Sequence, residues 1–175
     1  MRTVCLHGPE STGKSTLARE LAAHFKTVAV PEYGRIYCEV FGNDCDIDDL
    51  RAIRRGHELM AAAGRSKANG ILILDTDAVM TAVWSDILLG ARPADLDRID
   101  DPAELYLLCD IDVPFVADNI RYFPDPTARA RMFAQTKAEL EKRKLAFVII
   151  TGSREERLRT AIAAIVSKFP ELRAA

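Results

Sequence analysis

Short apolar runs alternate along the chain with longer segments in which apolar residues recur at every third or fourth position. The runs predict five strands, over residues 3–7, 27–30, 70–77, 103–110 and 146–152. The segments between them predict helices over residues 14–25, 35–41, 46–68, 78–90, 126–144 and 154–169. Strands that alternate with helices indicate a parallel sheet covered on both faces. We therefore expect a three-layer α/β/α fold with a five-stranded parallel sheet.

Length, charge and cysteine content narrow the class of protein. A chain of 175 residues is long enough for one domain with a sizeable core, so we expect residues 1–175 to form a single domain. The net charge of -2 gives no basic surplus that would favour nucleic acid or an anionic membrane as a partner. The four cysteines form no CxxC pair, which argues against a metal cluster and fits a reduced, cytoplasmic protein. No run approaches the roughly 20 apolar residues of a membrane span, and the sequence predicts no particular oligomeric state.

The segment HGPESTGKST, residues 7–16, lies between the first expected strand and the first expected helix. It contains the phosphate-binding pattern G-x-x-x-x-G-K-[ST], which requires this strand-to-helix setting. Backbone N–H groups in such a loop favour anions, the lysine reaches the β- and γ-phosphates, and the serine hydroxyl binds Mg²⁺. No N-K-x-D guanine signature is present, so ATP with Mg²⁺ is the expected cofactor. The candidate nucleotide-binding residues are Gly8, Glu10, Ser11, Thr12, Gly13, Lys14, Ser15 and Thr16.

Two acidic residues stand at the end of the expected strand in LILDTD, residues 72–77. Ligands of open α/β folds bind at the carboxyl edge of the sheet, where Asp75 and Asp77 are expected to lie. Asp75 follows the apolar run directly and is the better candidate for holding Mg²⁺. Asp77 is the weaker metal candidate, and we expect it to contact the substrate. A helix N-cap is the alternative for Asp75.

The stretch PEYGR, residues 31–35, follows the second expected strand and should reach the same edge of the sheet. Glu32 is a candidate base that accepts a proton from an acceptor hydroxyl or aligns that hydroxyl. Tyr33 offers a flat face for a ring, and Arg35 offers a charge for a substrate group. The alternatives are a helix cap for Glu32 and a structural ion pair for Arg35.

Further candidates follow the fourth and fifth expected strands. Asp118 and Asn119 are candidates for contact with sugar hydroxyls, with an Asx turn as the alternative for Asp118. Arg121 and Arg129 belong to an expected lid over residues 119–132 that brings arginines to the transferring phosphoryl group, or else they form a solvated face. Gly152 and Ser153 are candidates for contact with adenine. Trp84 fits the core better than a wall on which a substrate stacks.

Five stretches, in chain order, resemble one family: HGPESTGKSTLARELAAHF, PEYGR, LILDTDAVMTAVW, LYLLCDIDVPFVADNIR and ITGSREERLRTAI. They are similar to the ribosylnicotinamide kinase domain of NadR-type NAD-biosynthesis proteins, over about residues 2 to 166. The resemblance implies a P-loop kinase fold and transfer of phosphate from ATP to the 5′-hydroxyl of nicotinamide riboside, which gives nicotinamide mononucleotide. It implies that Lys14 and Ser15 serve ATP and metal and that Asp75 is the acid after the Walker B-like strand. It also places Glu32 and Tyr33 beside the nucleoside, and Asp118 and Arg121 in the substrate and lid segment.

Three departures from the family pattern bear on function. Bifunctional members carry an adenylyltransferase domain upstream, whereas this chain starts at the kinase strand, so we expect a second step toward NAD to be absent from it. Pro31 stands where some members place a tryptophan that stacks on the nicotinamide ring, and Asn119 stands where glycine is expected. The alternatives therefore remain a kinase of another nucleoside or small metabolite, or an ATP-binding regulatory protein without a small-molecule acceptor.

Overall fold

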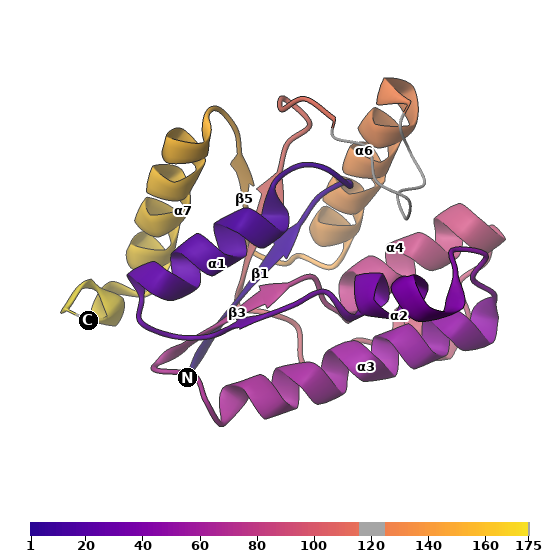
Figure 1. Ribbon diagram of the computed structural model, residues 1–175, viewed down its shortest axis with the longest axis horizontal. Coiled ribbons are helices and arrows are strands. Elements are labelled where there is room, and N and C mark those ends of the chain that lie inside the picture. The colour runs from indigo at the N-terminus through magenta and orange to yellow at the C-terminus, as the bar shows by residue number, and fades with distance from the viewer. Residues whose placement is uncertain (116–124, 175) are drawn as a thin grey trace.

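A computed structural model describes residues 1–115 and 125–174 of the chain and shows strands alternating with helices (Figure 1). The strands are β1 (Arg2–His7), β2 (Ala29–Val30), β3 (Ile71–Asp75), β4 (Leu105–Cys109) and β5 (Phe147–Ile150). The longer helices are α1 (Lys14–His24), α2 (Tyr33–Phe41), α3 (Ile47–Arg65), α4 (Ala78–Leu89), α6 (Pro126–Lys142) and α7 (Arg154–Lys168). Two short elements complete the fold, α5 (Ala94–Asp97) and a 3₁₀-helix (Pro170–Ala174).

The strands form one sheet in the order β2-β3-β1-β4-β5, and every pairing is parallel. The five-stranded parallel sheet expected from the sequence is thus confirmed. The central position of β1 sets the location of the site, because the loop after β1 emerges between the ends of β3 and β4. The register places Leu6 opposite Asp75 and His7 opposite Leu108.

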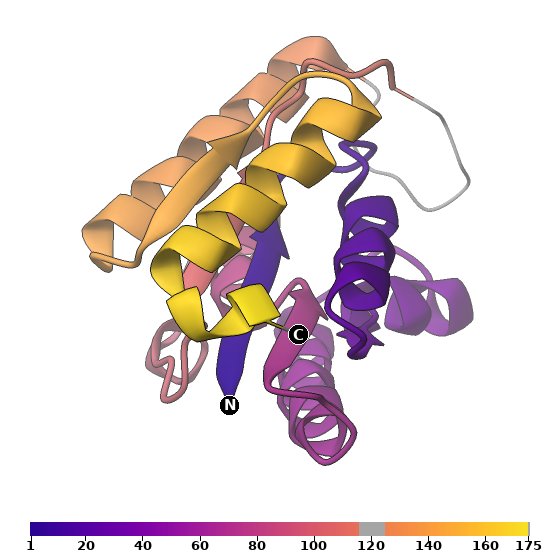
Figure 2. The same ribbon diagram turned by 90° about the vertical axis from the view of Figure 1, so that its left-hand side faces the viewer.

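Side chains alternate between the two faces of the sheet and build two separate cores. Val4, Leu6, Ile71 and Ile73 pack with α1 and α7 on one face. Their neighbours in the strands, such as Cys5, Leu72 and Leu74, pack on the other face against residues of α3, α4 and α6. Figures 1 and 2 show the sheet between these two groups of helices, which is the three-layer arrangement. Both faces are covered, so the central strands read as continuous apolar runs.

The differences from the sequence-based elements are at the ends of segments and in two short helices. The helix around PEYGR begins at Tyr33, two residues earlier than expected. Neither α5 nor the 3₁₀-helix was expected. The 3₁₀-helix begins at Pro170, a position that proline can occupy because it is tolerated in the first turn of a helix. Of the expected lid, residues 119–124 lie outside the described part of the chain, and residues 126–132 form the first turns of α6.

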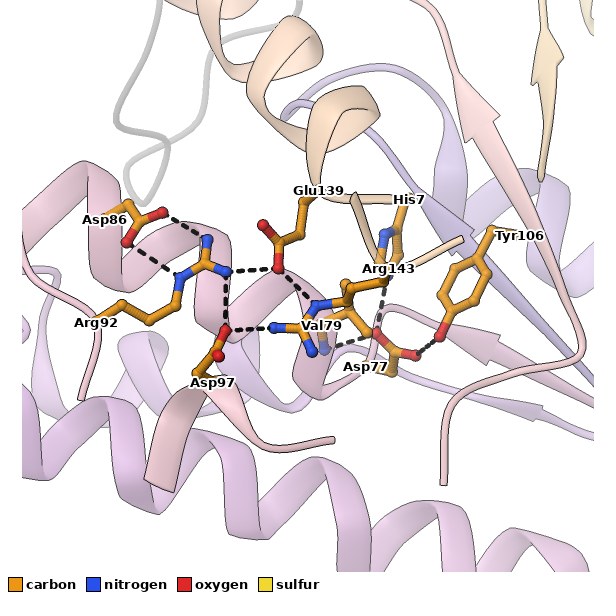
Figure 3. Close-up of polar contacts among 9 residues, drawn as sticks. All are labelled: His7, Asp77, Val79, Asp86, Arg92, Asp97, Tyr106, Glu139 and Arg143. Carbon is orange, nitrogen blue, oxygen red and sulfur yellow. Dashed lines mark hydrogen bonds and ion pairs between the residues drawn. The ribbon is translucent and has the colours of Figure 1, made fainter. Parts of the chain in front are cut away.

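A network of ion pairs fixes the C-terminal half of α6 to α4 and α5 (Figure 3). Arg92 contacts Asp86 on α4, Asp97 on α5 and the nearly buried Glu139 on α6. Arg143 binds the same two partners, with its Nη2 2.7 Å from Asp97 Oδ1 and its Nε 2.5 Å from Glu139 Oε1. The buried Glu139 therefore faces two arginines, and the largely buried Arg92 faces three carboxylates, so the charges that are withdrawn from water are compensated. Among residues 1–115 and 125–174, the helices lack the combination of length and apolar composition that a membrane span needs.

Candidate functional site

The loop between β1 and α1 has the backbone geometry of a phosphate-binding loop. Gly8 has φ 135°, and a Cβ at this position would lie 2.5 Å from the carbonyl oxygen of Cys109. Gly13 has φ 80° in the left-handed region, where glycine carries no steric penalty. It also occupies the N-cap of α1 and offers no side chain to that helix end. The first N–H groups of α1 are therefore free of a side-chain cap and favour an anion.

Side chains hold this loop in shape from inside and from behind. Lys14 Nζ donates to the carbonyl oxygens of Gly8 and Pro9 at 2.9 and 2.8 Å, and Thr12 Oγ1 donates to Pro9 at 2.8 Å. Behind the loop, the buried Arg157 donates to the Thr12 carbonyl at 3.0 Å and forms an ion pair with Asp112. Arg157 therefore supports the loop from the side of α7.

A cavity of about 660 Å³ opens in front of the loop. It extends from the loop and the start of α1, past the ends of β2 and β3, to α2, α3 and α4 and one residue of α6. This volume suits a small-molecule ligand, which is consistent with a substrate beside a nucleotide phosphate. Beyond the loop and α1 it is lined by Ala29, Val30, Pro31, Glu32, Gly34, Arg35, Ile36, Cys38, Cys45, Leu50, Ile53, His57, Asp75, Thr76, Met80, Thr81, Trp84, Leu88 and Met132.

Asp75 ends β3 and lies in the cavity wall beside the loop. Its side chain is buried, with 3% of the residue exposed, and its Oδ1 has no hydrogen-bond partner among the described residues. A buried carboxylate oxygen without a partner is costly unless a ligand satisfies it. The N-cap alternative applies to its neighbour, because Asp77 and not Asp75 caps α4. Asp75 and the Ser15 hydroxyl together offer the oxygen ligands that Mg²⁺ prefers.

Thr76 carries a strained backbone next to this carboxylate. Its φ is 85°, in a region that β-branched residues rarely adopt, and its buried Oγ1 has no hydrogen-bond partner among the described residues. Backbone strain of this kind is concentrated at functional sites. This strain could not be predicted from the sequence, since threonine is an unexpected residue at positive φ.

Asp77 corrects the expectation of a substrate contact, because its carboxylate points into the protein (Figure 3). His7 Nε2 lies 2.9 Å from one oxygen, and the hydroxyl of Tyr106 donates to the other at 2.8 Å. The N–H of Val79 donates to the carboxylate at 3.0 Å, which caps α4, and Asp77 does not line the cavity. Burial raises the pKa of Asp77, but His7 and these hydrogen bonds outweigh burial and lower it. Asp77 therefore joins β1, β4 and α4 beneath the loop.

This arrangement predicts a large stability cost for Tyr106→Phe. The substitution removes a buried hydrogen bond to a charged group and leaves the N–H of Ala103, now 3.0 Å from the Tyr106 hydroxyl, without its partner. We expect the free energy of unfolding to fall by about 2–3 kcal/mol in urea titrations. Tyr37→Phe is the matched control, because its hydroxyl donates to Asp49 at 2.6 Å in a half-exposed position and should contribute about 1 kcal/mol or less. Equal losses for the two variants would contradict the buried role of Asp77.

Glu32 occupies the N-cap position of α2 but makes no capping hydrogen bond with its side chain. The capping alternative is therefore wrong, and the carboxyl lines the cavity. Burial raises its pKa to about 7, helped by repulsion from Asp75 and Glu10 and opposed by attraction to Lys14 and Arg35. A carboxyl group that titrates near neutral pH inside a cavity is suited to accept a proton.

Tyr33, expected to face the nucleoside, lies elsewhere. Its ring packs on α3 so closely that a Cβ added to Gly56 would be 2.1 Å from Tyr33 Cδ1. Tyr33 does not line the cavity, and its ring centroid lies 6.4 Å from that of His57. Arg35 lines the cavity, and its Nε donates to Glu39 Oε1 at 3.1 Å, so the ion pair named as its alternative is present.

The part of the cavity wall formed by α3, α4 and α6 is mainly apolar. His57 of α3 and Trp84, Met80 and Leu88 of α4 line it, together with Met132 of α6. Burial lowers the pKa of His57 to about 4, so its ring is neutral at pH 7. The sequence offered Trp84 only as the weaker alternative to a core residue and did not single out the others.

The remaining candidates lie outside this cavity or outside the described residues. Gly152 and Ser153 do not line it: the N–H of Gly152 donates to Asp112 Oδ2 at 2.6 Å, and Ser153 caps α7. Arg129 is buried in α6, and its guanidinium carbon lies 5.4 Å from the centroid of the Phe115 ring. Contacts of these three with a nucleotide stay predictions. Asp118, Asn119 and Arg121 lie among the residues that the structure does not describe.

The parallel sheet, the loop and the cavity at its carboxyl edge define a protein with a P-loop kinase fold. The family model described as AAA domain matches residues 3–157, and the chain belongs to that family. It is also related to the "Trifunctional NAD biosynthesis/regulator protein NadR" of Escherichia coli (strain K12), with 29% identity over 154 residues. That alignment covers 85% of this chain and 38% of the relative, so the chain spans well under half of the longer protein. The resemblance to NadR found in the sequence is thereby confirmed.

Solved structures share the fold. A crystal structure of NadR protein in complex with NR matches this chain with a TM-score of 0.77 and 24% sequence identity. The match covers 97% of this chain and 52% of the NadR chain. A crystal structure of NadR protein in complex with NAD and AMP-PNP has a TM-score of 0.75 and 24% identity, over 95% of this chain and 49% of that chain. Thymidylate kinase from Ehrlichia chaffeensis has a TM-score of 0.67 and 16% identity, over 93% of this chain and 98% of that chain.

Proposed function

We propose that this protein transfers the γ-phosphoryl group of ATP to the 5′-hydroxyl of a nucleoside, and that the nucleoside is nicotinamide riboside. The observation that carries the proposal is one continuous cavity lined by the P-loop, Asp75 and Glu32. The same cavity has an apolar recess, formed by residues of α3, α4 and α6. The relationship to NadR supports the choice of acceptor, since NadR protein has been crystallised with NR and with AMP-PNP. The product would be nicotinamide mononucleotide.

In this proposal the loop and Lys14 hold the triphosphate at the start of α1. The backbone N–H groups of the loop and the helix end favour phosphate oxygens, and the lysine charge opposes the negative charge that develops during transfer. Ser15 and Asp75 would hold Mg²⁺, a fit supported by the buried Oδ1 of Asp75, which has no hydrogen-bond partner within residues 1–115 and 125–174. The ion, when bound, neutralises charge on the β- and γ-phosphates.

Glu32 would align the 5′-hydroxyl and accept its proton. Its carboxyl lines the same cavity as Lys14, and its pKa of about 7 allows it to be ionised at neutral pH while still accepting a proton. The transition state of phosphoryl transfer is loose, so the positioning of both substrates contributes more than the strength of this base.

The apolar recess would hold the ring of the nucleoside. Trp84 supplies an aromatic face there, and aromatic faces attract cations such as the positively charged nicotinamide ring of the riboside. His57, neutral at pH 7, does not repel that charge. Pro31, at the position where some family members place a tryptophan, also lines the cavity, and we assign the stacking role in this chain to Trp84.

The experiment that tests this function is an ADP-release assay with ATP, Mg²⁺ and a panel of nucleosides, with product masses measured. We expect nicotinamide riboside to yield the mononucleotide and to be preferred over uncharged nucleosides. Turnover of another nucleoside alone would retain the kinase and change its acceptor. ATP binding without any acceptor-dependent ADP would favour a regulatory nucleotide-binding protein instead.

A further inference from the structure

Two cysteines lie next to each other in the wall of the cavity. Cys38 belongs to α2, and Cys45 lies in the connection between α2 and α3. Their sulfur atoms are 3.8 Å apart, both residues are half-buried, and both line the cavity. The chain folds back between them at Gly42, whose φ of 92° marks a sharp change of direction after α2.

The other two cysteines differ in each of these respects. Cys5 and Cys109 are fully buried in the sheet, on opposite faces of it. Burial raises the pKa of the Cys109 thiol to about 11 and that of the Cys38 thiol to about 12, so access to solvent, and not ionisation, distinguishes the two pairs. Any thiol chemistry of the folded protein is therefore concentrated at Cys38 and Cys45.

The surroundings of this pair of cysteines do not resemble a metal-binding site. No third histidine, cysteine or acidic ligand completes a metal-binding group around Cys38 and Cys45 among the described residues. The two sulfur atoms are instead in contact with each other at 3.8 Å, and a disulfide bond would bring them to about 2.0 Å.

We propose that Cys38 and Cys45 are a site of reversible oxidation, and that their disulfide locks the wall of the acceptor end of the cavity. With glutathione disulfide as the oxidant, one thiolate attacks a sulfur of the disulfide and releases the first glutathione. The second cysteine then attacks the protein sulfur of this mixed disulfide and releases the second glutathione. The two protein thiols lose two electrons and two protons, and two glutathione thiols are formed.

The position of the pair gives the disulfide its effect. None of the nine residues of α2 is buried, so the helix is held on the protein mainly through partly buried side chains such as Tyr33 and Tyr37. Cys45 packs against the cluster formed by Leu50, Ile53 and Leu96. A covalent bond from α2 to this cluster would therefore fix a wall that also contributes Arg35 and Ile36 to the cavity. The phosphate-binding loop belongs to the segment between β1 and α1 and not to α2, so we expect nucleotide binding to be spared.

The test is oxidation of the intact protein in glutathione buffers of graded ratio, followed by alkylation, denaturation and peptide mass mapping. We expect two of the four thiols to disappear together, with Cys38 linked to Cys45, and dithiothreitol to restore them. Cys45→Ser and Cys38→Ser are the matched controls, because each should stop at a single glutathione adduct. Loss of the Cys5 or Cys109 thiols first, or glutathione adducts on the wild type without the internal disulfide, would overturn the proposal.

A second measurement reports the effect on the cavity and rests on the proposed function. We expect oxidation to raise the KM for the nucleoside severalfold and to leave the affinity for ATP unchanged, while the Cys38→Ser, Cys45→Ser double variant shows no response to oxidant. An unchanged KM in a fully oxidised sample would refute the locking role. If the wild type has no kinase activity at all, the proposed function fails, and the site of oxidation is still decided by the mass mapping and by the affinity for ATP before and after oxidation.

Discussion

Replacing Lys14 with alanine should reduce ATP-dependent turnover by about 10²–10³-fold, the range found when a group that stabilises transition-state charge is removed. Lys14 is the cation in the P-loop, and its Nζ now donates to the carbonyl oxygens of Gly8 and Pro9. When a triphosphate enters, the same ammonium group can turn to the phosphate oxygens, whose charge exceeds that of two carbonyl dipoles. Steady-state kinetics with saturating acceptor measures the loss.

The fold of this variant should persist, because the two lost hydrogen bonds lie at a half-exposed loop. Thermal melting of Lys14→Ala beside Lys168→Ala, an exposed lysine at the end of α7, separates folding from catalysis. We expect similar melting temperatures and full activity in the Lys168 variant. Normal turnover by a folded Lys14→Ala protein would refute the assignment of the phosphate site.

Glu32→Gln should lower kcat by about 10²–10³-fold and remove the acidic limb of the pH–rate profile. The wild-type carboxyl has a pKa of about 7 and works as a base only when ionised, so the rate should fall about tenfold per pH unit below pH 7. Glutamine keeps the size and hydrogen-bonding capacity of the side chain but does not titrate. The measurement is kcat from pH 5 to 9 for both proteins.

The same substitution should stabilise the protein at alkaline pH. The pKa of Glu32 is raised on folding, from 4.5 to about 7, so the native state holds a proton that the unfolded state has already lost. Stability contributed by this group is complete below pH 4.5 and is lost as the pH rises through 7. Solvent in the cavity moderates the effect, and we expect Glu32→Gln to exceed the wild type by about 1–3 kcal/mol at pH 8 and by nothing at pH 4.

Glu39→Gln is the control for both measurements, since Glu39 lies on the same helix, is exposed and pairs with Arg35. It should change neither the pH–rate profile nor the stability. A Glu32→Gln protein whose kcat is normal and whose acceptor KM alone is raised would show that Glu32 binds substrate and is not a base.

The sheet and the P-loop could be predicted because their signals are local. Apolar runs fix β1 and β3, and the spacing of Gly8, Gly13 and Lys14 defines the loop between a strand and a helix. The position of Asp75 follows from the same reasoning, since the last residue of a buried strand must reach the edge of the sheet. These features depend on residues that are neighbours in the chain.

Asp77 and Tyr33 could not be placed in this way. The sequence predicted correctly that Asp77 lies at the carboxyl edge of the sheet. The orientation of its side chain depends on His7 and Tyr106, which belong to two other strands. Tyr33 turns toward α3 because Gly56 leaves room for its ring, and no pattern within PEYGR shows that space. The apolar end of the cavity is equally non-local, because it is assembled from helices that meet only in the folded protein.

The two glycines of the phosphate-binding pattern are required for different structural reasons, so they should tolerate substitution differently in related proteins. Position 8 has no room for a side chain because the carbonyl oxygen of Cys109 lies against it. This requirement comes from the packing of the end of β1 beside β4. A Cβ at Gly13 would meet no atom of the described residues within 4 Å, so glycine is needed there for its left-handed conformation at the start of α1 and not for space. A protein that no longer bound nucleotides could replace Lys14 without loss of stability and Gly13 with a modest loss of stability. It would still require glycine at position 8. In such proteins Gly8 would persist for the packing of β1 beside β4, so its presence alone would not indicate that phosphate is bound.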